Sequence, residues 1–388
     1  MVALVQKITG KHTETINITN YALKWVVTKN AEIHVENGSA ILENGTTDRT
    51  IVIAGTLRTD NGGSMSLLGY NDVVTITKTA HLFGPAQVEG TSYEMTNDGT
   101  IRSSSNYGTM VFESASGMFE NNGKIINTVA NGFILLDDDV TLVNGKHGQI
   151  IGETAGVWSG SDDVVFLKNH GKIEGGTYSF RGATSADIIT NKGTMIGDIS
   201  LGQGTDSVDT RGGRINGVIT GGLDDDTLVT SNAKYKLIEE VGGGDYDAVG
   251  ATVSYKLNAN VEILHLLGKK DINATGNTGS NVLLGNDGDN KIKGGGEGAA
   301  HDTLTGAGGN DQFIFTRDDG TYTITDFQNG HDKIGFVGFD TIDKFSDISG
   351  RISQQGDDVL ISVAGVFAQI LLEDTDLAQI DRHDFFFG

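Results

Sequence analysis

Aspartates in glycine-rich turns are the residues of this chain with the clearest chemistry. Near its end a nine-residue pattern recurs, with glycine at positions one and four, aspartate or asparagine at position six and an apolar residue at position eight. Glycine permits tight turns that expose backbone carbonyls, and aspartate adds a carboxylate oxygen. Because Ca²⁺ prefers about six to eight oxygen ligands, the pattern predicts calcium binding.

The copies of this nonapeptide differ in their expected affinity for calcium. The first two follow each other without a gap from Gly276, and two residues are inserted before Asp302, the aspartate of the third. Position six is Asn281 and Asn290 in the first two copies, so we expect those turns to bind metal weakly or not at all, and Asp302 and Asp311 to be better ligands. Such repeats stack into a calcium-binding β-helix, so several ions are expected. The candidate ligands in this region, from side chains or turn backbone, are Gly285, Asp287, Gly288, Asp289, Asn290, Gly295, Glu297, Asp302, Gly306, Gly308, Asp311, Asp326 and Asp332.

A second row of aspartates precedes the nonapeptides. On neighbouring coils of a stacked structure, these side chains would lie about 4.8 Å apart. Each pair would repel by about 0.9 kcal/mol in water, or about 3.5 kcal/mol at an effective dielectric of about 20, unless cations neutralise the row. We therefore add Asp206, Asp226 and Asp247 to the candidate metal ligands. The alternative is that the aspartates accept backbone N–H bonds in turns. The row consists of Asp139, Asp163, Asp187, Asp206, Asp226 and Asp247.

A longer repeat organises the middle of the chain. The motif Asn-x-Gly-x-Ile occurs at Asn97, Asn121 and Asn169, with looser copies at Lys146, Asn191 and Arg211, and its glycines are 20 to 25 residues apart. Short runs of Val, Ile and Thr lie between these turns. This period predicts a parallel β-solenoid with one inward apolar residue stacked on each coil. Helical periodicity is confined to residues 22–28 and 374–380.

Composition excludes several classes of protein. The 388 residues carry a net charge of -23, which disfavours nucleic acid and anionic lipid as partners. The absence of cysteine excludes disulfides and thiolate metal sites. No stretch approaches the roughly 18 apolar residues of a membrane span, and no cleavable signal peptide is expected at the N-terminus.

Catalytic motifs are absent from the sequence. It contains no His-Glu-x-x-His metalloprotease signature, Gly-x-Ser-x-Gly elbow, P-loop or dinucleotide fingerprint. The acidic clusters at 137–139, 162–163 and 224–226 could build a carboxylate site on a polysaccharide-acting β-helix. Trp25 and Trp158 are the only tryptophans available as platforms for a sugar. The sequence therefore assigns no catalytic residue and favours a non-catalytic protein over an enzyme.

From about residue 200 onward the sequence resembles the RTX, or hemolysin-type calcium-binding, proteins that Gram-negative bacteria export by type I secretion. The nonapeptides carry the resemblance, together with segments 260–268, 308–315 and 324–334. The resemblance implies a secreted, extracellular or cell-surface protein that uses the type I secretion machinery, with an uncleaved export signal within 341–388. It also implies that the chain stays unfolded in a calcium-poor cytosol and folds in the calcium outside the cell.

The expected fold class is all-β: a right-handed parallel β-helix or β-solenoid that continues into an RTX calcium β-roll and a C-terminal β-rich cap. The expected divisions are an N-terminal cap (1–35), coils of about 20 to 25 residues (36–250), the β-roll (251–320), and a cap with the secretion signal (321–388).

We expect a non-catalytic adhesin, matrix, surface or host-interaction factor that takes an extracellular polysaccharide or cell-surface ligand. The alternatives are an extracellular polysaccharide lyase, epimerase or hydrolase, and a toxin or bacteriocin-like effector.

Overall fold

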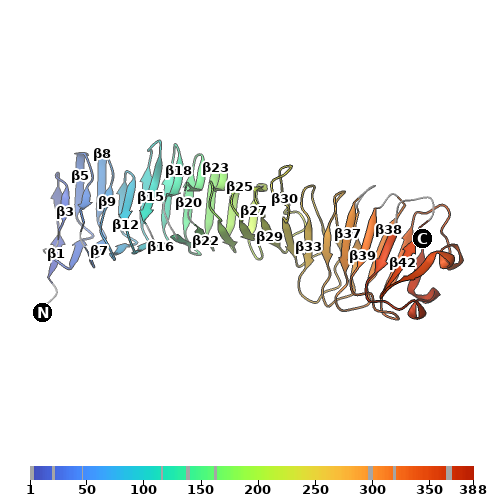
Figure 1. Ribbon diagram of the computed structural model, residues 1–388. Coiled ribbons are helices and arrows are strands. Elements are labelled where there is room, and N and C mark those ends of the chain that lie inside the picture. The colour runs from blue at the N-terminus through green and yellow to red at the C-terminus, as the bar shows by residue number, and fades with distance from the viewer. Residues whose placement is uncertain are drawn as a thin grey trace. The chain divides into compact units, whose positions relative to one another are not determined.

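The computed structural model describes residues 4–19, 22–45, 47–114, 117–136, 140–160, 164–295, 300–317, 320–363 and 369–388. Contacts divide the chain into two compact units, Met1–Thr220 and Gly221–Gly388. Each is a parallel β-solenoid whose strands stack coil upon coil (Figure 1). Within the described ranges the only helical segments are four short 3-10 helices, η1 to η4 (Phe345–Asp347, Ser349–Arg351, Leu377–Gln379, Arg382–Asp384).

Unit 1 consists of three ladders of parallel strands; most coils contribute one strand to each ladder, and the long strands β23 and β25 extend through the second and the third. The first ladder contains β1 (Val5–Ile8), β4 (Lys24–Val27), β7 (Thr50–Ile53), β10 (Val73–Ile76), β13 (Tyr93–Asn97), β16 (Gly117–Asn121), β19 (Val140–Asn144), β22 (Val165–Asn169), β24 (Ile188–Asn191) and β26 (Ser207–Asp209). The second contains β2 (Lys11–His12), β5 (Glu32–Asn37), β8 (Thr56–Asn61), β11 (His81–Phe83), β14 (Thr100–Ser103), β17 (Lys124–Asn127), β20 (Gln149–Gly152), β23 (Lys172–Arg181), β25 (Thr194–Gln203) and β27 (Arg214–Asn216). The third contains β3 (Ile16–Ile18), β6 (Ile41–Glu43), β9 (Met65–Leu67), β12 (Ala86–Gly90), β15 (Gly108–Ser114), β18 (Asn131–Leu135) and β21 (Ala155–Ser159), which pairs with the long β23. Strand β28 (Ile219–Leu223) contains the boundary between the units.

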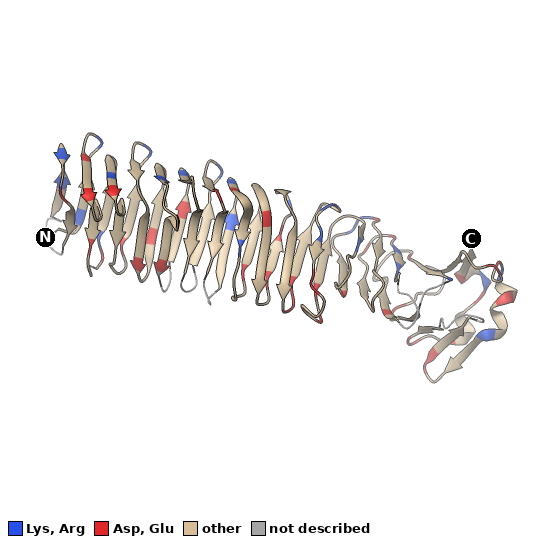
Figure 2. Cartoon of the chain, turned by 90° about the horizontal axis from the view of Figure 1, so that it is seen from above, with Lys and Arg blue, Asp and Glu red and all other residues tan. Residues whose placement is uncertain are grey.

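Inward apolar residues in register form the core of unit 1. In the second ladder one buried side chain per coil lies over the next, and burying each stabilises the fold by about 1.5–3 kcal/mol relative to exposure. Outward positions alternate with these, and Lys and Arg are most frequent along one edge of the coils (Figure 2). The stacked row is Ile33, Leu57, Leu82, Ile101, Ile125, Ile150, Ile173 and Met195.

A buried ladder of asparagines explains the Asn-x-Gly motif. The amide Nδ2 of each asparagine donates to Oδ1 of the next at 2.8 Å, through Asn97, Asn121, Asn144, Asn169 and Asn191. At three of these positions Oδ1 also accepts the backbone N–H of the glycine two residues later. Each amide is therefore satisfied by copies of itself, which is what a stacked polar core requires.

The glycine of the motif is needed for close approach to the preceding coil. A Cβ at Gly123 would collide with the carbonyl of Gly99, and one at Gly193 with the carbonyl of Gly171. Since the contacted atoms are backbone, no side chain could move aside.

Two looser copies of the motif were misaligned in the sequence analysis. Lys146 does not take the asparagine position; Asn144 does, and the two extra residues before Gly148 lie in a wider turn. Arg211 is also displaced, because β26 is in register with β24 and thereby places buried Thr210 opposite Asn191.

Unit 2 begins as a narrower solenoid with strands on two faces. One face contains β29 (Thr227–Thr230), β31 (Ala248–Ala251), β33 (Ile263–Leu266), β35 (Val282–Leu284), β37 (His301–Thr305) and β39 (Thr321–Ile324). The other contains β32 (Tyr255–Lys256), β34 (Ala274–Thr275), β36 (Lys291–Lys293), β38 (Gln312–Thr316), β40 (Lys333–Val337) and β44 (Phe385–Phe387). Successive nonapeptides thus alternate between faces, as expected for a β-roll. Strand β30 (Leu237–Ile238) precedes β31.

The C-terminal part of unit 2 closes the stack. Strands β41 (Ile352–Gln355), β42 (Asp358–Ser362) and β43 (Gln369–Leu372) are antiparallel to one another, and β43 pairs in parallel with β39. This hairpin covers the edge of the last coil, which would otherwise present unpaired backbone groups.

The chain's beginning differs from expectation. Strands β1 to β3 already pair in register with β4 to β6, so residues 5–18 form a coil of the solenoid where the sequence predicts a cap. The helix expected at 22–28 is wrong, because β4 occupies Lys24–Val27; of the one expected at 374–380, only η3 is present.

Candidate metal centres

Acidic side chains of unit 2 lie one above another at the start of successive strands. Oδ1 of Asp247 accepts the backbone N–H of Asp226 at 2.7 Å, and Oε2 of Glu262 accepts that of Asp247 at 3.0 Å. One oxygen of each carboxylate therefore caps the strand of the preceding coil. The second oxygen of Asp247 is buried and has no hydrogen-bond donor among the described residues.

Asp226, Glu239 and Asp247 converge on one point. All three are buried, and one oxygen from each lies within 4.8 Å of the other two. Oε2 of Glu239 accepts the N–H of Gly222 at 3.2 Å, while Oε1 lacks a donor in the described part of the chain. We call Asp226, Glu239 and Asp247 the acidic trio.

The trio's electrostatics oppose ionisation in the absence of a cation. Burial raises the pKa of Glu239 to about 8, and the charges of Asp247 and Asp226 push it in the same direction. Burial also raises the pKa of Asp247, as does the charge of Asp225. A cation or bound protons must therefore accompany this cluster in the folded state.

A glycine is required at the first turn position because the acidic side chain folds back over it. A Cβ at Gly221 would collide with the oxygens of Glu239 and Asp226, and one at Gly306 would meet Oδ2 of Asp311. The spacing of five residues from glycine to aspartate in the nonapeptide thus has a steric cause.

Asp311 forms the centre of a second acidic group. Its Oδ1 accepts the N–H of Asn290 at 2.8 Å, and its buried Oδ2 has no donor among the described residues. Burial raises its pKa to about 7, and the charges of Asp332, Asp326 and Asp289 add to the rise. Asp311 therefore has the same unmet need for positive charge as the trio.

Asp326 and Asp332 use their oxygens differently. Asp326 accepts the N–H groups of Gly306 and Ala307, and Asp332 accepts those of Asp311 and Gln328, all at 2.8–2.9 Å. Both carboxylates therefore cap turn backbone with these oxygens.

The turns with asparagine at position six close without a metal. Nδ2 of Asn290 donates to the carbonyl of Ile272 at 2.8 Å and to Oδ1 of Asn286 at 2.9 Å. Nδ2 of Asn281 donates to Val261 O and Asn277 Oδ1 in the same manner. In both turns an amide NH₂ group therefore donates to oxygens beside the turn, and weak metal binding there stays a prediction.

The other predicted ligands divide by exposure. Asp287 is exposed and pairs with Lys269 at 3.0 Å, and exposed Asp289 accepts the N–H of Asn310 at 2.8 Å. Buried Asp302 accepts the N–H of Asn281 at 2.8 Å.

The remaining positions are turn residues or lie elsewhere. Gly285, Gly288, Gly295 and Gly308 lie in the turns between strands. Asp206 belongs to unit 1, where Oδ1 accepts the N–H of Asp187. Glu297, Asp139 and Asp163 lie outside the described residues.

Glu239 and Glu262 are the acidic residues that the sequence analysis missed. The predicted row contains aspartates alone, whereas Glu239 and Glu262 reach the same row from the positions just after β30 and just before β33. The sequence carries no signal for Glu239, because Leu237 and Ile238 are both apolar and only the structure shows that Leu237 is buried and Ile238 exposed.

Unit 1 contains a buried pair of carboxyl groups, Glu43 and Asp72, which neighbouring side chains stabilise. Burial and the neighbouring Asp72 raise the pKa of Glu43 to about 9, while Tyr93 donates its hydroxyl to Glu43 at 3.0 Å. Arg49 opposes the rise electrostatically. A proton, a phenol and a guanidinium group thus stabilise this pair.

The acidic trio and Asp311 fit a hard divalent cation. Their ligand atoms are all oxygens, some are buried without donors, and glycines leave room for the carboxylates. Ca²⁺ accepts such a set, with backbone carbonyls or water completing the shell.

Comparisons with known proteins add little. No protein-family model matches the sequence, and no curated protein matches it. Among solved structures, the extracellular lipase LipA from Serratia marcescens is similar at 17% identity with a TM-score of 0.22, over 59% of this chain and 45% of the lipase. The chain thus spans less than half of that protein, and a TM-score this low carries no inference. No helix in the described ranges is long and apolar enough to span a membrane.

Proposed function

We propose that this protein is a secreted calcium-binding β-solenoid protein whose second unit folds around Ca²⁺ outside the cell. The observation that carries the proposal is the set of buried carboxylate oxygens without hydrogen-bond donors at Glu239, Asp247 and Asp311. Leaving charged oxygens buried and unpaired costs several kcal/mol each, so a folded unit 2 at neutral pH needs a counter-charge.

Calcium would supply that charge outside the cell, where it is abundant, and not in the cytosol, where it is scarce. Where Ca²⁺ is scarce, the carboxylates must retain protons or repel one another, and the folded state is weak. At a free concentration about 100 times the dissociation constant, each independent site adds about 2.7 kcal/mol to the free energy of unfolding. The chain would then remain unfolded until it meets calcium.

The proposed role outside the cell is binding rather than catalysis. We propose an adhesin, matrix, surface or host-interaction factor, exported by type I secretion, as the RTX resemblance implies. The carboxylates that cluster most closely are buried, so they suit structural metal binding better than attack on a substrate.

Calcium titration tests the proposal directly. Isothermal titration calorimetry of the EDTA-treated chain is expected to show binding at more than one site, with circular dichroism and hydrogen exchange reporting new structure in residues 221–363. An unchanged spectrum and no heat of binding would contradict it.

A variant with a matched control locates the sites. Glu239→Gln is expected to weaken the calcium response of the trio about tenfold or more, because it removes one charged ligand. Exposed Glu240→Gln removes the same charge beside it and is expected to change the calcium affinity by less than about twofold.

A further inference from the structure

A notch lies at the corner between the second and third ladders of unit 1, where one coil is shorter than its neighbours. The corner runs from Leu57 to Met65 in one coil and from Leu82 to Ala86 in the next, although these residues are in register across the ladders. The short coil therefore lacks four residues at this corner. It turns instead through Gly84, at φ +115°, and Pro85, the single proline of the chain.

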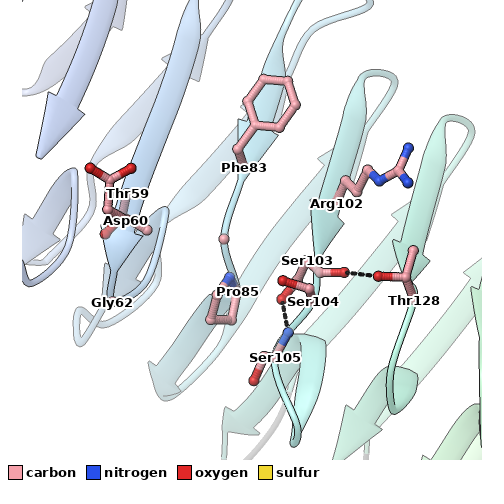
Figure 3. A pocket seen from close by; sticks show the side chains of 11 residues that line it. Thr59, Asp60, Gly62, Phe83, Pro85, Arg102, Ser103, Ser104, Ser105 and Thr128 are labelled. Carbon is pink, nitrogen blue, oxygen red and sulfur yellow. Dashed lines mark hydrogen bonds between the residues drawn. The ribbon is translucent and has the colours of Figure 1, made fainter. Parts of the chain in front are cut away.

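The notch has the size of a small-molecule site. Its volume is about 640 Å³, within the roughly 300–1,000 Å³ of ligand pockets. Figure 3 shows Asp60, Phe83 and Arg102 on three adjacent strands, with Pro85 and Ser103–Ser105 beyond them toward the corner. Thr59 and Thr128 also line it, so hydroxyl groups surround an aromatic ring and a guanidinium group.

Positive charge is concentrated beside the aromatic ring. Arg58, Phe83 and Arg102 occupy equivalent outward positions on successive coils. The guanidinium of Arg58 lies over the Phe83 ring at 4.3 Å, whereas Arg102 is exposed and forms no ion pair with any described residue. In a chain with a net charge of -23, two arginines that form no ion pair within the described ranges mark a place for an external anion.

The notch also contains one carboxylate, which restricts the class of ligand that can bind there. Asp60 lines the notch, and its Oδ1 lies 3.0 Å from Nε2 of His34. The Asp60 side chain nevertheless remains about half exposed. A polyanion with charge along its whole length, such as nucleic acid, would be repelled by Asp60. A ligand with one acidic group and several hydroxyls satisfies both ends of the notch.

We propose that this notch binds an acidic saccharide, with a uronate residue as the recognised unit. Arg102 holds the carboxylate by paired N–H···O bonds, Asp60 and the serine and threonine hydroxyls bind sugar hydroxyls, and Phe83 packs against the apolar face of the ring. The inference names a ligand class for the proposed extracellular binding role. It does not depend on calcium, because the trio and Asp311 belong to the other unit.

Binding of defined oligosaccharides to the full chain tests the inference. A trisaccharide with a single galacturonate residue and the neutral trigalactoside are compared by calorimetry, once with calcium and once with EDTA. The uronate is expected to bind at least about tenfold more tightly, and more weakly as salt rises. Equal affinity for both sugars would overturn the proposal, and so would displacement of the uronate by inorganic sulfate at equal concentration.

Two variants and a control assign the site. Arg102→Gln removes the charge, and Ser104→Trp fills the notch at an exposed position without removing charge. Both are expected to reduce uronate affinity about tenfold or more, with unchanged circular dichroism. Exposed Arg214→Gln, outside the notch, makes the same charge change and is expected to have no effect. Uronate binding that survives both notch variants would overturn the proposal. Loss of the calcium response with uronate binding intact would remove only the calcium proposal.

Discussion

The asparagine ladder of unit 1 and the aspartate row of unit 2 are two answers to one problem. Both stack a buried polar side chain on each coil of a parallel solenoid. In the ladder, each amide donates to the next at 2.8 Å and the row is complete in itself. In the acidic row, a carboxylate accepts one backbone N–H, but Asp247 and Asp311 each keep a second oxygen without a donor.

The difference between NH₂ and O⁻ therefore decides whether a stack is self-sufficient. An amide carries donor and acceptor, while a carboxylate only accepts. Unit 2 contains both solutions, because Asn290 fills with its amide the position where Asp311 keeps a bare oxygen. A stack that is complete in itself and one that lacks a counter-charge thus differ by a single atom type.

An aspartate in the asparagine ladder is expected to have a large effect on stability. Asn144→Asp would place a charge against Asn169 Oδ1 and the carbonyl of Lys172, and is expected to lower the free energy of unfolding by about 3 kcal/mol or more. Exposed Asn216→Asp serves as the control in the same unit. Thermal unfolding in EDTA measures both, and an unaltered midpoint for Asn144→Asp would contradict the role of the ladder.

The reverse exchange is expected to stabilise the metal-free protein. Asp247→Asn would give the trio a donor, raising metal-free stability by about 1 kcal/mol, while calcium stabilises this variant less than the parent chain. If calcium stabilised both equally, Asp247 would not be a ligand.

A comparable effect is expected from the glycine that the acidic side chain covers. Gly306→Ala would force its Cβ against Oδ2 of Asp311 and is expected to weaken calcium binding at that turn by about tenfold, or about 1.4 kcal/mol. Gly308→Ala is the matched control, since its nearest new neighbour would be Asp287 Cα at 3.6 Å. Calcium titration followed by thermal unfolding compares them, and equal behaviour would argue against the folded-back side chain.

A further prediction concerns pH in the absence of metal. The raised pKa values of Glu239, about 8, and Asp311, about 7, mean that the folded state binds protons more tightly than the unfolded chain. Metal-free stability should therefore be greatest below about pH 4.5 for these groups and fall as pH rises toward 8. Calcium should remove most of this slope, and thermal unfolding in EDTA that is independent of pH between 5 and 8 would contradict the shifts.

Much of the fold followed from periodicity, and the failures have physical causes. The repeat of 20 to 25 residues gave the parallel solenoid, because stacked coils need one turn and one inward residue per period. The repeat did not give the correct alignment at Lys146 and Arg211. Two inserted residues before Gly148, and the replacement of the ladder asparagine by Thr210, shift the motif in the sequence while the coil itself is kept. Residues 22–28 were misjudged as helical since a short apolar run fits either period, and pairing of β4 with β1 and β7 selected the strand.

The all-β solenoid class could be read from the sequence, because glycine turns and inward apolar residues recur at a fixed spacing and act through local geometry. Which acidic groups meet depends on contacts between coils and became evident in the folded chain. Glu239 reaches Asp226 and Asp247 from the position just after β30, and the notch exists because one coil is shorter than those beside it. Such proximity depends on register between coils, which is set by packing across the whole stack rather than by any one segment.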